Sequence, residues 1–219
     1  MKIWNALLVG VGGTGVITLK RIIEHAGLQN PKVGKIFGAE KHGLAQREGS
    51  VDVHVRFLIL EDGEKVDGNE YFLSAPTIPF GEADFCIGIE PLELLRDAKF
   101  ISSNATVIMN TYSIWPPSTI SEEFQYPTIH RIEQLIKEIS KVPEIIIIDA
   151  TSMAIQEMGS AIYTNNILLG VGLATGNMPL TKENVVEALK EQVGNIEKNI
   201  KSLEVGIEYG KKMLKSKNS

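Results

Sequence analysis

The segment that most constrains the fold is a glycine-rich turn near the N-terminus, Gly10-Val-Gly12-Gly13-Thr14-Gly15. A short apolar run, residues 3–9, precedes it and is typical of a central parallel strand. Apolar residues at helical spacing follow it as far as His25. A glycine turn between a strand and a helix lets the backbone approach a phosphate at the positive end of the helix. We therefore expect a strand–turn–helix unit whose turn either binds an anion or nucleotide or serves only close packing.

Apolar runs and helical stripes alternate along the rest of the chain. Further strands are expected at residues 33–37, 51–57, 85–89, 105–109 and 144–148, and helices at residues 129–139 and beyond Thr181. This alternation, with no repeat or linker, indicates a single α/β domain over residues 1–219. The expected architecture is three-layer α/β/α, with a mostly parallel Rossmann-like sheet and a helical C-terminal arm over residues 180–219.

The third strand has a pattern of its own. Between residues 51 and 57, apolar side chains alternate with Asp52, His54 and Arg56. Such alternation predicts a half-exposed strand that is antiparallel or near an edge of the sheet. The second strand, residues 33–37, is expected to lie beside the first, because strands that follow one another in the chain are commonly neighbours.

Composition narrows the class of partner. The chain has 219 residues and a formal net charge of -5, which argues against nucleic acid or an anionic membrane as a partner. Two long uncharged stretches, residues 3–19 and 158–181, contain glycines or asparagines and are interpreted as buried protein, not as a signal peptide or membrane span. We expect a cytoplasmic protein.

The single cysteine, Cys86, excludes several metal sites. One thiol cannot form an internal disulfide, a four-cysteine iron–sulfur site or a cysteine-rich zinc site. The four histidines show no metal-ligand spacing. Cys86 lies in an apolar strand and is expected to be an inert core thiol.

A second loop, residues 38–50, gathers polar side chains between two strands. They are Glu40, Lys41, His42, Gln46, Arg47 and Glu48. The run is either a solvated loop with ion pairs or a binding loop at the carboxyl end of the sheet, beside the glycine turn. Arg47 suits a phosphate or carboxylate, and we expect it near the mouth of the glycine turn.

The glycine turn, the stretch His42-Gly-x-Ala-Gln-Arg-x-Gly-Ser-Val51 and the following His54-Val-Arg56 resemble the gamma-type domain of 2-oxoacid:ferredoxin oxidoreductases. The resemblance is strongest to the indolepyruvate branch of that family and covers nearly the whole chain. Later segments agree in order: Glu82-Ala-Asp84, Gly88-Ile-Glu90-Pro91, Asn110, Asp149-Ala150 and Asn166-Ile-Leu-Leu-Gly170. Two features depart from the family pattern: Glu48, where a glycine is usual, and an insertion-like stretch at residues 60–71.

The resemblance implies a role within a complex. Such enzymes oxidatively decarboxylate a 2-oxoacid with thiamine diphosphate, pass electrons through iron–sulfur clusters to ferredoxin, and form an acyl-CoA. This chain has no Gly-Asp-Gly thiamine motif and too few cysteines for a cluster. The resemblance therefore implies a cluster-free small subunit, with thiamine diphosphate and the clusters on a larger catalytic subunit and ferredoxin an indirect partner. No cofactor is expected to bind tightly to this chain alone.

The resemblance also gives candidate contact residues. Coenzyme A or the partner subunit would meet this chain at Gly10, Gly12, Gly13, Thr14, Gly15, His42, Gln46 and Arg47. The partner surface could also include Trp115 or the C-terminal arm, where Gly206 and Gly210 lie one turn apart, although that arm could instead pack on the chain's own sheet. Self-association of the isolated chain is left open.

The alternative is a free-standing oxidoreductase or nucleotide-binding module that uses the glycine turn for NAD(P) or FAD. Such a site also needs an acidic residue at the end of the second strand, about 20 residues beyond the turn. Glu40 follows Gly15 by 25 residues, past Gly38, and fits that position poorly.

Overall fold

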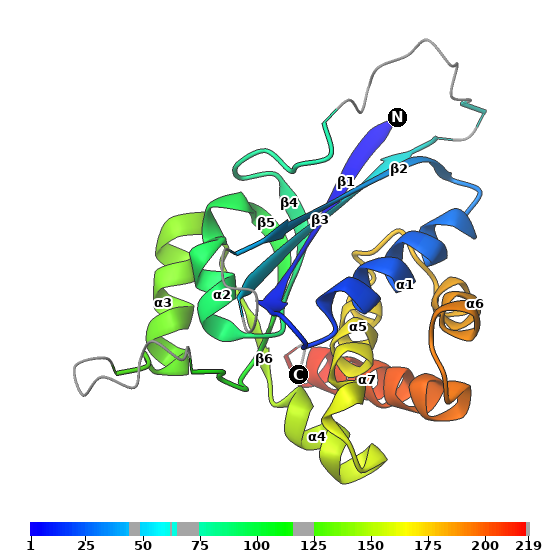
Figure 1. Cartoon of the computed structure of the whole chain (residues 1–219). Helices are drawn as coiled ribbons and strands as arrows, with labels where there is room; N and C mark the ends of the chain where they lie inside the picture. Colours follow the sequence, from blue (N-terminus) through cyan, green and yellow to red (C-terminus); the bar gives the residue numbers. More distant parts are fainter. Residues whose placement is uncertain (44–48, 62, 65–74, 116–124, 218–219) are drawn as a thin grey trace.

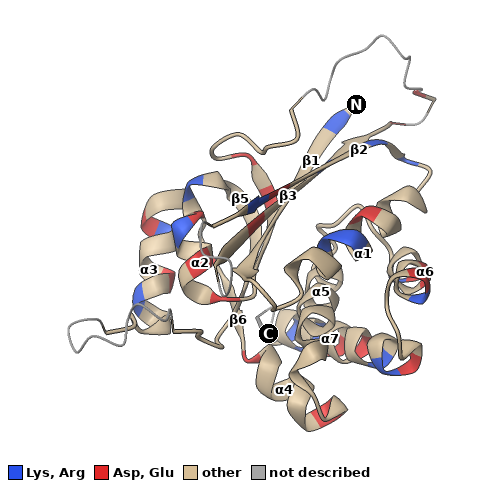
Figure 2. Cartoon of the chain, viewed as in Figure 1, with Lys and Arg blue, Asp and Glu red and all other residues tan. Residues whose placement is uncertain are grey.

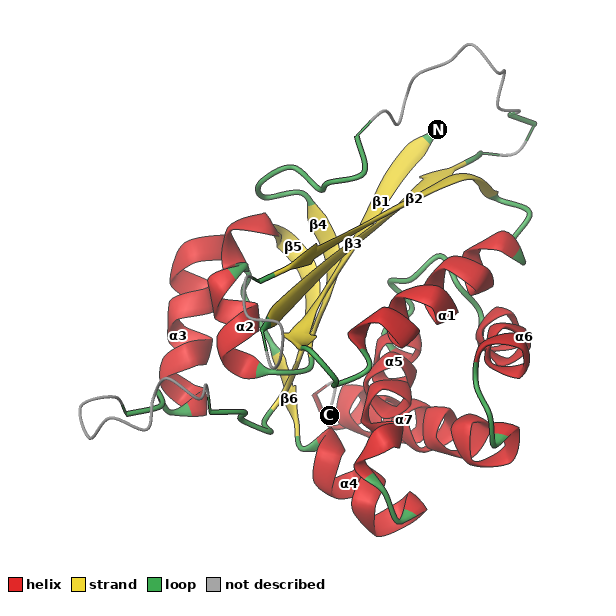
Figure 3. Cartoon of the chain, in the orientation of Figure 1, coloured by secondary structure: helices red, strands yellow, loops and turns green. Residues whose placement is uncertain are grey.

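The computed structural model describes residues 1–43, 49–61, 63–64, 75–115 and 125–217. Within them lies a six-stranded sheet with the spatial order β2-β3-β1-β4-β5-β6 (Figures 1 and 3). β1, β4, β5 and β6 are parallel, whereas β3 is antiparallel to both β1 and β2. The expected α/β class and mostly parallel sheet are confirmed. The strands are β1 (Lys2–Val11), β2 (Val33–His42), β3 (Ser50–Ile59), β4 (Ala83–Gly88), β5 (Ile101–Asn110) and β6 (Ile146–Ile148).

Helices cover both faces of the sheet (Figure 1). α2 (Pro91–Arg96) and α3 (Ile129–Ser140) lie on one face, and α1 (Val16–Leu28) and α5 (Thr164–Ala174) lie on the other. α4 (Ala150–Met158) follows β6, and a short 3-10 turn, Ala161–Tyr163, connects it to α5. α6 (Lys182–Gln192) packs on α1, and α7 (Ile196–Lys217) packs on α5. The helical C-terminal arm therefore forms an outer layer over α1 and α5.

β1 lies inside the sheet, between β3 and β4, and both of its faces are buried. Successive side chains of a strand point to opposite faces. Ala6 and Leu8 belong to the core beneath α1 and α5. Leu7 and Val9 belong to the core beneath α2 and α3. The continuous apolar run of β1 thus fills two cores and fixes the position of the glycine turn that follows it.

β3 corrects one sequence prediction. Its antiparallel pairing is confirmed, but the strand is not half-exposed: Asp52, His54 and Arg56 are all buried. The Nε of Arg56 donates to Asn5 Oδ1 at 2.9 Å, and its Nη1 donates to the carbonyl oxygen of Ala75 at 2.7 Å. The segment around residues 75–78 therefore covers the polar face of the strand. The alternation of polar and apolar residues within β3 does not show that a segment about 20 residues later in the chain buries this face.

The position of β2 in the sheet also differs from the prediction. β2 was expected beside β1, but β3 lies between them. The chain reverses between His42 and Ser50, so β3 returns antiparallel and pairs with β1 along its full length, from Lys2 opposite Ile59 to Val11 opposite Ser50. The start of β3 therefore lies directly beside the glycine turn, and the end of β2 lies one strand farther away.

The C-terminal arm packs on α5. A Cβ atom at Gly206 would overlap the carbonyl oxygen of Ile167, and one at Gly170 would overlap the carbonyl oxygen of Leu203. Asn166 Nδ2 donates to Asn199 Oδ1 at 2.6 Å across the same contact. The side of α7 that contains Gly206 therefore packs against α5 of the same chain. The sequence analysis had left open whether this arm contacts a partner subunit or the chain's own sheet.

Candidate functional site

The glycine turn lies between β1 and α1, as predicted from the sequence. Gly13 and Gly15 have φ angles of 92° and 82°, which side chains disfavour, and Gly15 is the N-cap of α1. The backbone N–H and the hydroxyl of Thr14 both donate to the carbonyl oxygen of Val11, at 3.1 and 2.7 Å. The turn is therefore held by its own hydrogen bonds.

Two of the glycines serve different purposes. A Cβ atom at Gly10 would come within 2.9 Å of Val16 Cγ2, so Gly10 permits close packing of the strand against α1. A Cβ atom at Gly13 would meet nothing within 4 Å, so this position faces open space. Packing explains Gly10 without a ligand, whereas Gly13 leaves backbone accessible beside the start of the helix.

The N-terminus of α1 is suited to an anion. No side chain caps it, and its first turn contains no acidic residue. The first N–H groups of a helix lack partners within the helix and attract negative charge. The turn and α1 together are therefore a candidate for binding a phosphate or carboxylate group.

The second loop reaches this site from the side of β3. The N–H of Gly12 donates to the carbonyl oxygen of Gly49 at 2.8 Å. His42 pairs with Val51 in the sheet, and Val51 pairs with Gly10. His42 also lines, with Val51 and the glycine turn, a hollow of about 300 Å³.

The structure therefore places His42 at the edge of a hollow beside the glycine turn. The His42 side chain is largely exposed, and its Nε2 lies 3.5 Å from Glu40 Oε2. Gln46, Arg47 and Glu48 lie outside the described residues. The expectation that Arg47 lies at the mouth of the turn stays a prediction.

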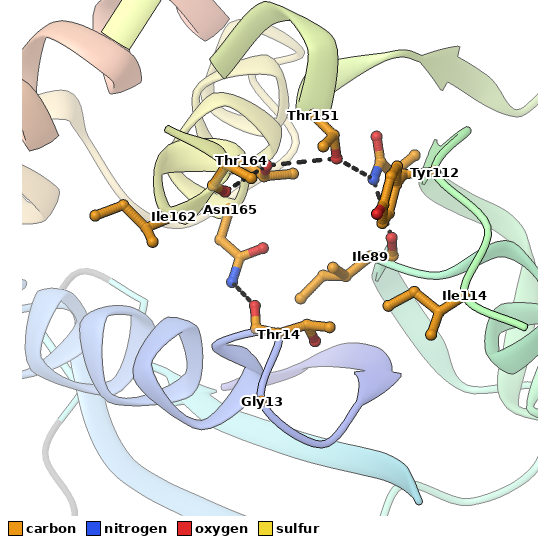
Figure 4. Close-up of a pocket in the computed structure, with 11 residues that line it drawn as sticks. Gly13, Thr14, Ile89, Tyr112, Ile114, Thr151, Ile162, Thr164 and Asn165 are labelled. Carbon is orange, nitrogen blue, oxygen red and sulfur yellow. Dashed lines mark hydrogen bonds between the residues drawn. The ribbon is translucent and has the colours of Figure 1, made fainter. Parts of the chain in front are cut away.

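A second hollow opens on the other side of the turn, toward α5 (Figure 4). Its volume is about 240 Å³, and its walls come from the glycine turn, the ends of β4 and β5, α4 and the start of α5. Its lining residues are Gly13, Thr14, Ile89, Asn110, Tyr112, Ile114, Thr151, Ala161, Ile162, Thr164 and Asn165. We call it the Asn165 pocket.

Asn165 was not assigned a role from the sequence. Its Nδ2 donates to the carbonyl oxygen of Thr14 at 2.9 Å, and a Cβ atom at Gly15 would come within 2.9 Å of that nitrogen. Its Oδ1 is buried without a hydrogen-bond partner in the structure. Figure 4 shows this oxygen turned toward the space between Ile89 and Thr151. An asparagine within a long uncharged stretch was a signal, but only the fold shows that it meets the glycine turn.

Glu90 has a structural role at the end of β4. It caps α2 by accepting from the N–H of Glu93 at 2.9 Å, and Pro91 stands at the first helical position, as the sequence indicated. The hydroxyl of Tyr126 donates to the other oxygen of Glu90. These bonds satisfy the buried carboxylate.

Two other buried carboxyl groups lie near Glu90. Burial raises the pKa of Glu93 to about 7, although nearby Arg96 opposes the shift. Burial, together with the charge of Asp52 and a hydrogen bond to it, raises the pKa of Asp97 to about 7. The charge of Asp52 on β3 acts on both groups, and neither group lines the hollow at His42 or the Asn165 pocket.

The surroundings of Cys86 do not suit metal binding. Cys86 is fully buried in β4, and burial raises the pKa of its thiol, which agrees with an inert core residue. A buried lone thiol does not fit an iron–sulfur cluster. Among the described residues, no three His, Cys, Asp or Glu side chains are grouped to hold a metal ion.

No helix in the described part of the chain has the length and apolarity needed to cross a bilayer.

Comparisons with known proteins give a consistent result. The family model of pyruvate ferredoxin/flavodoxin oxidoreductases matches residues 5–209. A protein of Archaeoglobus fulgidus named indolepyruvate oxidoreductase subunit IorB is 38% identical over 205 residues, covering 92% of each chain. A protein of the same name from Pyrococcus horikoshii is 32% identical, covering 98% of this chain and 99% of that protein.

Solved structures agree on the fold. A pyruvate oxidoreductase subunit, PORC, of Thermotoga maritima has a TM-score of 0.62 at 16% identity, covering 97% of both chains. The 2-oxoglutarate:ferredoxin oxidoreductase of Magnetococcus marinus, solved with 2-oxoglutarate, coenzyme A and succinyl-CoA, has a TM-score of 0.61 at 15% identity. The match covers 97% of this chain but 32% of the Magnetococcus chain. With the family model and two relatives spanning nearly its whole length, the chain belongs to the pyruvate ferredoxin/flavodoxin oxidoreductase family, as a subunit of an oxidoreductase complex.

Proposed function

We propose that this chain, acting as a single gamma-type domain, is the small subunit of a 2-oxoacid:ferredoxin oxidoreductase whose complex oxidises indolepyruvate or another aryl pyruvate. The observation that carries the proposal is its similarity, over nearly the whole length, to two proteins named indolepyruvate oxidoreductase subunit IorB. The complex would work in the cytoplasm and pass its electrons to ferredoxin through the larger subunit.

The chemistry of the residues supports a division of labour between subunits. Cys86 is buried and alone, so this chain does not fit an iron–sulfur cluster. It also contains no Gly-Asp-Gly thiamine motif. Thiamine diphosphate and the clusters therefore belong on the larger subunit, and the small subunit supplies architecture and part of a coenzyme site.

We propose that coenzyme A contacts the glycine turn where the small subunit meets the larger one. Open space at Gly13 and the uncapped start of α1 fit an approaching phosphate group. His42 lies at the edge of the same hollow. Gln46 and Arg47 follow it in sequence, and Arg47 would add a bidentate partner for phosphate.

The alternative, a free-standing NAD(P)- or FAD-dependent enzyme, is not supported. The acidic residue such a site needs would end a strand beside β1. Glu40 instead lies on β2, separated from β1 by β3, and its Oε1 accepts from Lys20 Nζ at 2.9 Å. That carboxylate is occupied by an ion pair with α1.

A reconstitution assay tests the proposal. The purified chain is assayed alone and with its larger subunit for dye reduction driven by indolepyruvate, phenylpyruvate, pyruvate and 2-oxoglutarate. Alone it should contain neither iron nor thiamine diphosphate and should oxidise none of the acids. The reconstituted complex should reduce dye fastest with an aryl pyruvate. Substantial oxidation by the lone chain, or no requirement for it in the complex, would refute the proposal.

A further inference from the structure

We infer that the Asn165 pocket and its apolar rim receive a large, neutral side chain of the larger subunit, one that donates a hydrogen bond to Asn165 Oδ1. The inference rests on the proposed function, because it takes the larger subunit as the occupant. It assigns a surface of this chain, beside the glycine turn, to the contact between subunits.

The first argument is the chemistry of Asn165. This side chain is only 9% exposed, and its Oδ1 has no partner in the structure. Its Nδ2 is fixed by the bond to the Thr14 carbonyl oxygen, so turning the amide over would place two acceptors against each other. A buried acceptor without a partner is destabilising, because it has lost its hydrogen bonds to water. The pocket is therefore complete only when a donor enters it.

The second argument is the rest of the lining. Asn110 uses its whole amide: Nδ2 donates to the Ile89 carbonyl oxygen and to Thr151 Oγ1, and Oδ1 accepts from the N–H of Ala150. No lining residue carries a charge. Ile89, Ile114, Ile162 and Tyr112 make much of the wall apolar. The occupant must therefore be neutral, mostly apolar and equipped with one N–H or O–H donor.

The third argument is the rim. Tyr112 is 54% exposed and Ile162 is 76% exposed, on opposite sides of the pocket (Figure 4). Trp115, close to Tyr112 in sequence, is 56% exposed and packs against Tyr126 with ring centroids 5.7 Å apart. Large exposed aromatic and aliphatic side chains around a small pocket are typical of the centre of a protein interface.

The charge pattern of the pocket favours a protein over a free ligand. Charged side chains lie on α1, α2, α3, α4, α6 and α7, whereas none of the residues that line the pocket is charged (Figure 2). An uncharged, largely apolar lining suits a permanent subunit contact, because such interfaces are more hydrophobic than transient ones.

The family relationship says what covers this face. The relatives that match nearly the full chain are named as subunits. In the Magnetococcus enzyme, the matching fold is 32% of a longer chain, so the same fold is there built together with others. The pocket also adjoins the glycine turn through Gly13 and Thr14, so a subunit docked there would close one side of the coenzyme site.

The test measures binding of the larger subunit to surface variants. Ile162→Glu and Tyr112→Ala alter the exposed rim, and Ile139→Glu is the matched control, because Ile139 is 52% exposed on α3, in the opposite helical layer. Each rim variant should weaken binding by about tenfold or more, whereas the control should bind like the wild type. Thermal melting of each variant confirms that the fold is intact.

Asn165→Ala tests the hydrogen bond itself. It should weaken binding of the larger subunit, as the rim variants do, because the Oδ1 acceptor is removed. If rim variants bind the larger subunit normally, the inference is wrong. It is equally wrong if the rim variants raise only the KM for coenzyme A of the reconstituted complex, because the pocket then belongs to the coenzyme. If the wild-type chain neither binds the larger subunit nor supports turnover, the proposed function itself fails.

Discussion

The carbonyl oxygen of Ile167, on α5, occupies the place where any side chain at Gly206, on α7, would put its Cβ atom. Gly170 and Leu203 repeat the relationship in the opposite sense. Two glycines thus let the backbones of α5 and α7 touch, and the start of α5 in turn forms one wall of the Asn165 pocket. The stability of the site therefore depends on a helix contact far away in the sequence.

Gly206→Ala should destabilise the protein by about 1–3 kcal/mol, because the helices must separate to admit a methyl group. Urea unfolding of the isolated chain measures the change. Gly194→Ala is the matched control, since a Cβ atom there would meet nothing within 4 Å. Equal stability of the two variants would contradict the close contact.

Arg56→Met should cost about 2–3 kcal/mol of unfolding free energy, because a charged donor of several hydrogen bonds is lost from a buried position. The change leaves Asn5 Oδ1 and the Ala75 carbonyl oxygen without the donors they have in the structure. Arg21→Met, at an exposed position on α1, is the control and should lie within about 0.5 kcal/mol of wild type. A stability unchanged by Arg56→Met would show that the segment at residues 75–78 is not held by this side chain.

Features encoded by neighbouring residues could be predicted from the sequence. The glycine turn is one, since the apolar run before it and the helical stripe after it both lie within 20 residues. Glu90 and Pro91 at the start of α2 are another, because capping is a local interaction. The α/β class follows from the same local periods.

Features that depend on contacts between residues far apart in the sequence could not be predicted. The burial of Asp52, His54 and Arg56 depends on the segment at residues 75–78, which covers them, and the order of β2 and β3 depends on which of them pairs with β1. The unpartnered oxygen of Asn165 depends on a hydrogen bond to Thr14, 151 residues away. Local motifs predicted the candidate residues of the glycine turn, whereas no local signal linked Asn165 to Thr14.

The raised pKa of Asp97, about 7, gives a pH dependence of known sign. A carboxyl group whose folded pKa lies above its unfolded value, about 3.9, is protonated in the native state while the unfolded chain is not. This group therefore penalises folding fully above pH 7, and the penalty is relieved as the pH falls from about 7 toward 4.

Asp97→Asn should consequently stabilise the protein at pH 8 by about 1–3 kcal/mol and change it little at pH 5. The amide still offers Asp52 a donor, as the protonated carboxyl does. Urea unfolding at both pH values measures the effect, with Glu157→Gln at an exposed position of α4 as control. A loss of stability at pH 8 would mean that Asp97 is charged and favourably paired in the native protein.

The proposed coenzyme contact leads to a prediction about kinetics. Arg47→Ala and His42→Ala in the reconstituted complex should raise the KM for coenzyme A by about tenfold each, with little change in the KM for the 2-oxoacid, because only the coenzyme carries phosphates to this loop. The wild-type KM for coenzyme A should rise with salt, and Arg47→Ala should flatten that dependence, since screening weakens a contact between exposed charges. Arg21→Ala, which also removes one positive charge but lies on α1 outside the hollows at the turn, is the control. If Arg47→Ala and Arg21→Ala give the same KM, the second loop is a solvated segment and the contact belongs to the glycine turn alone.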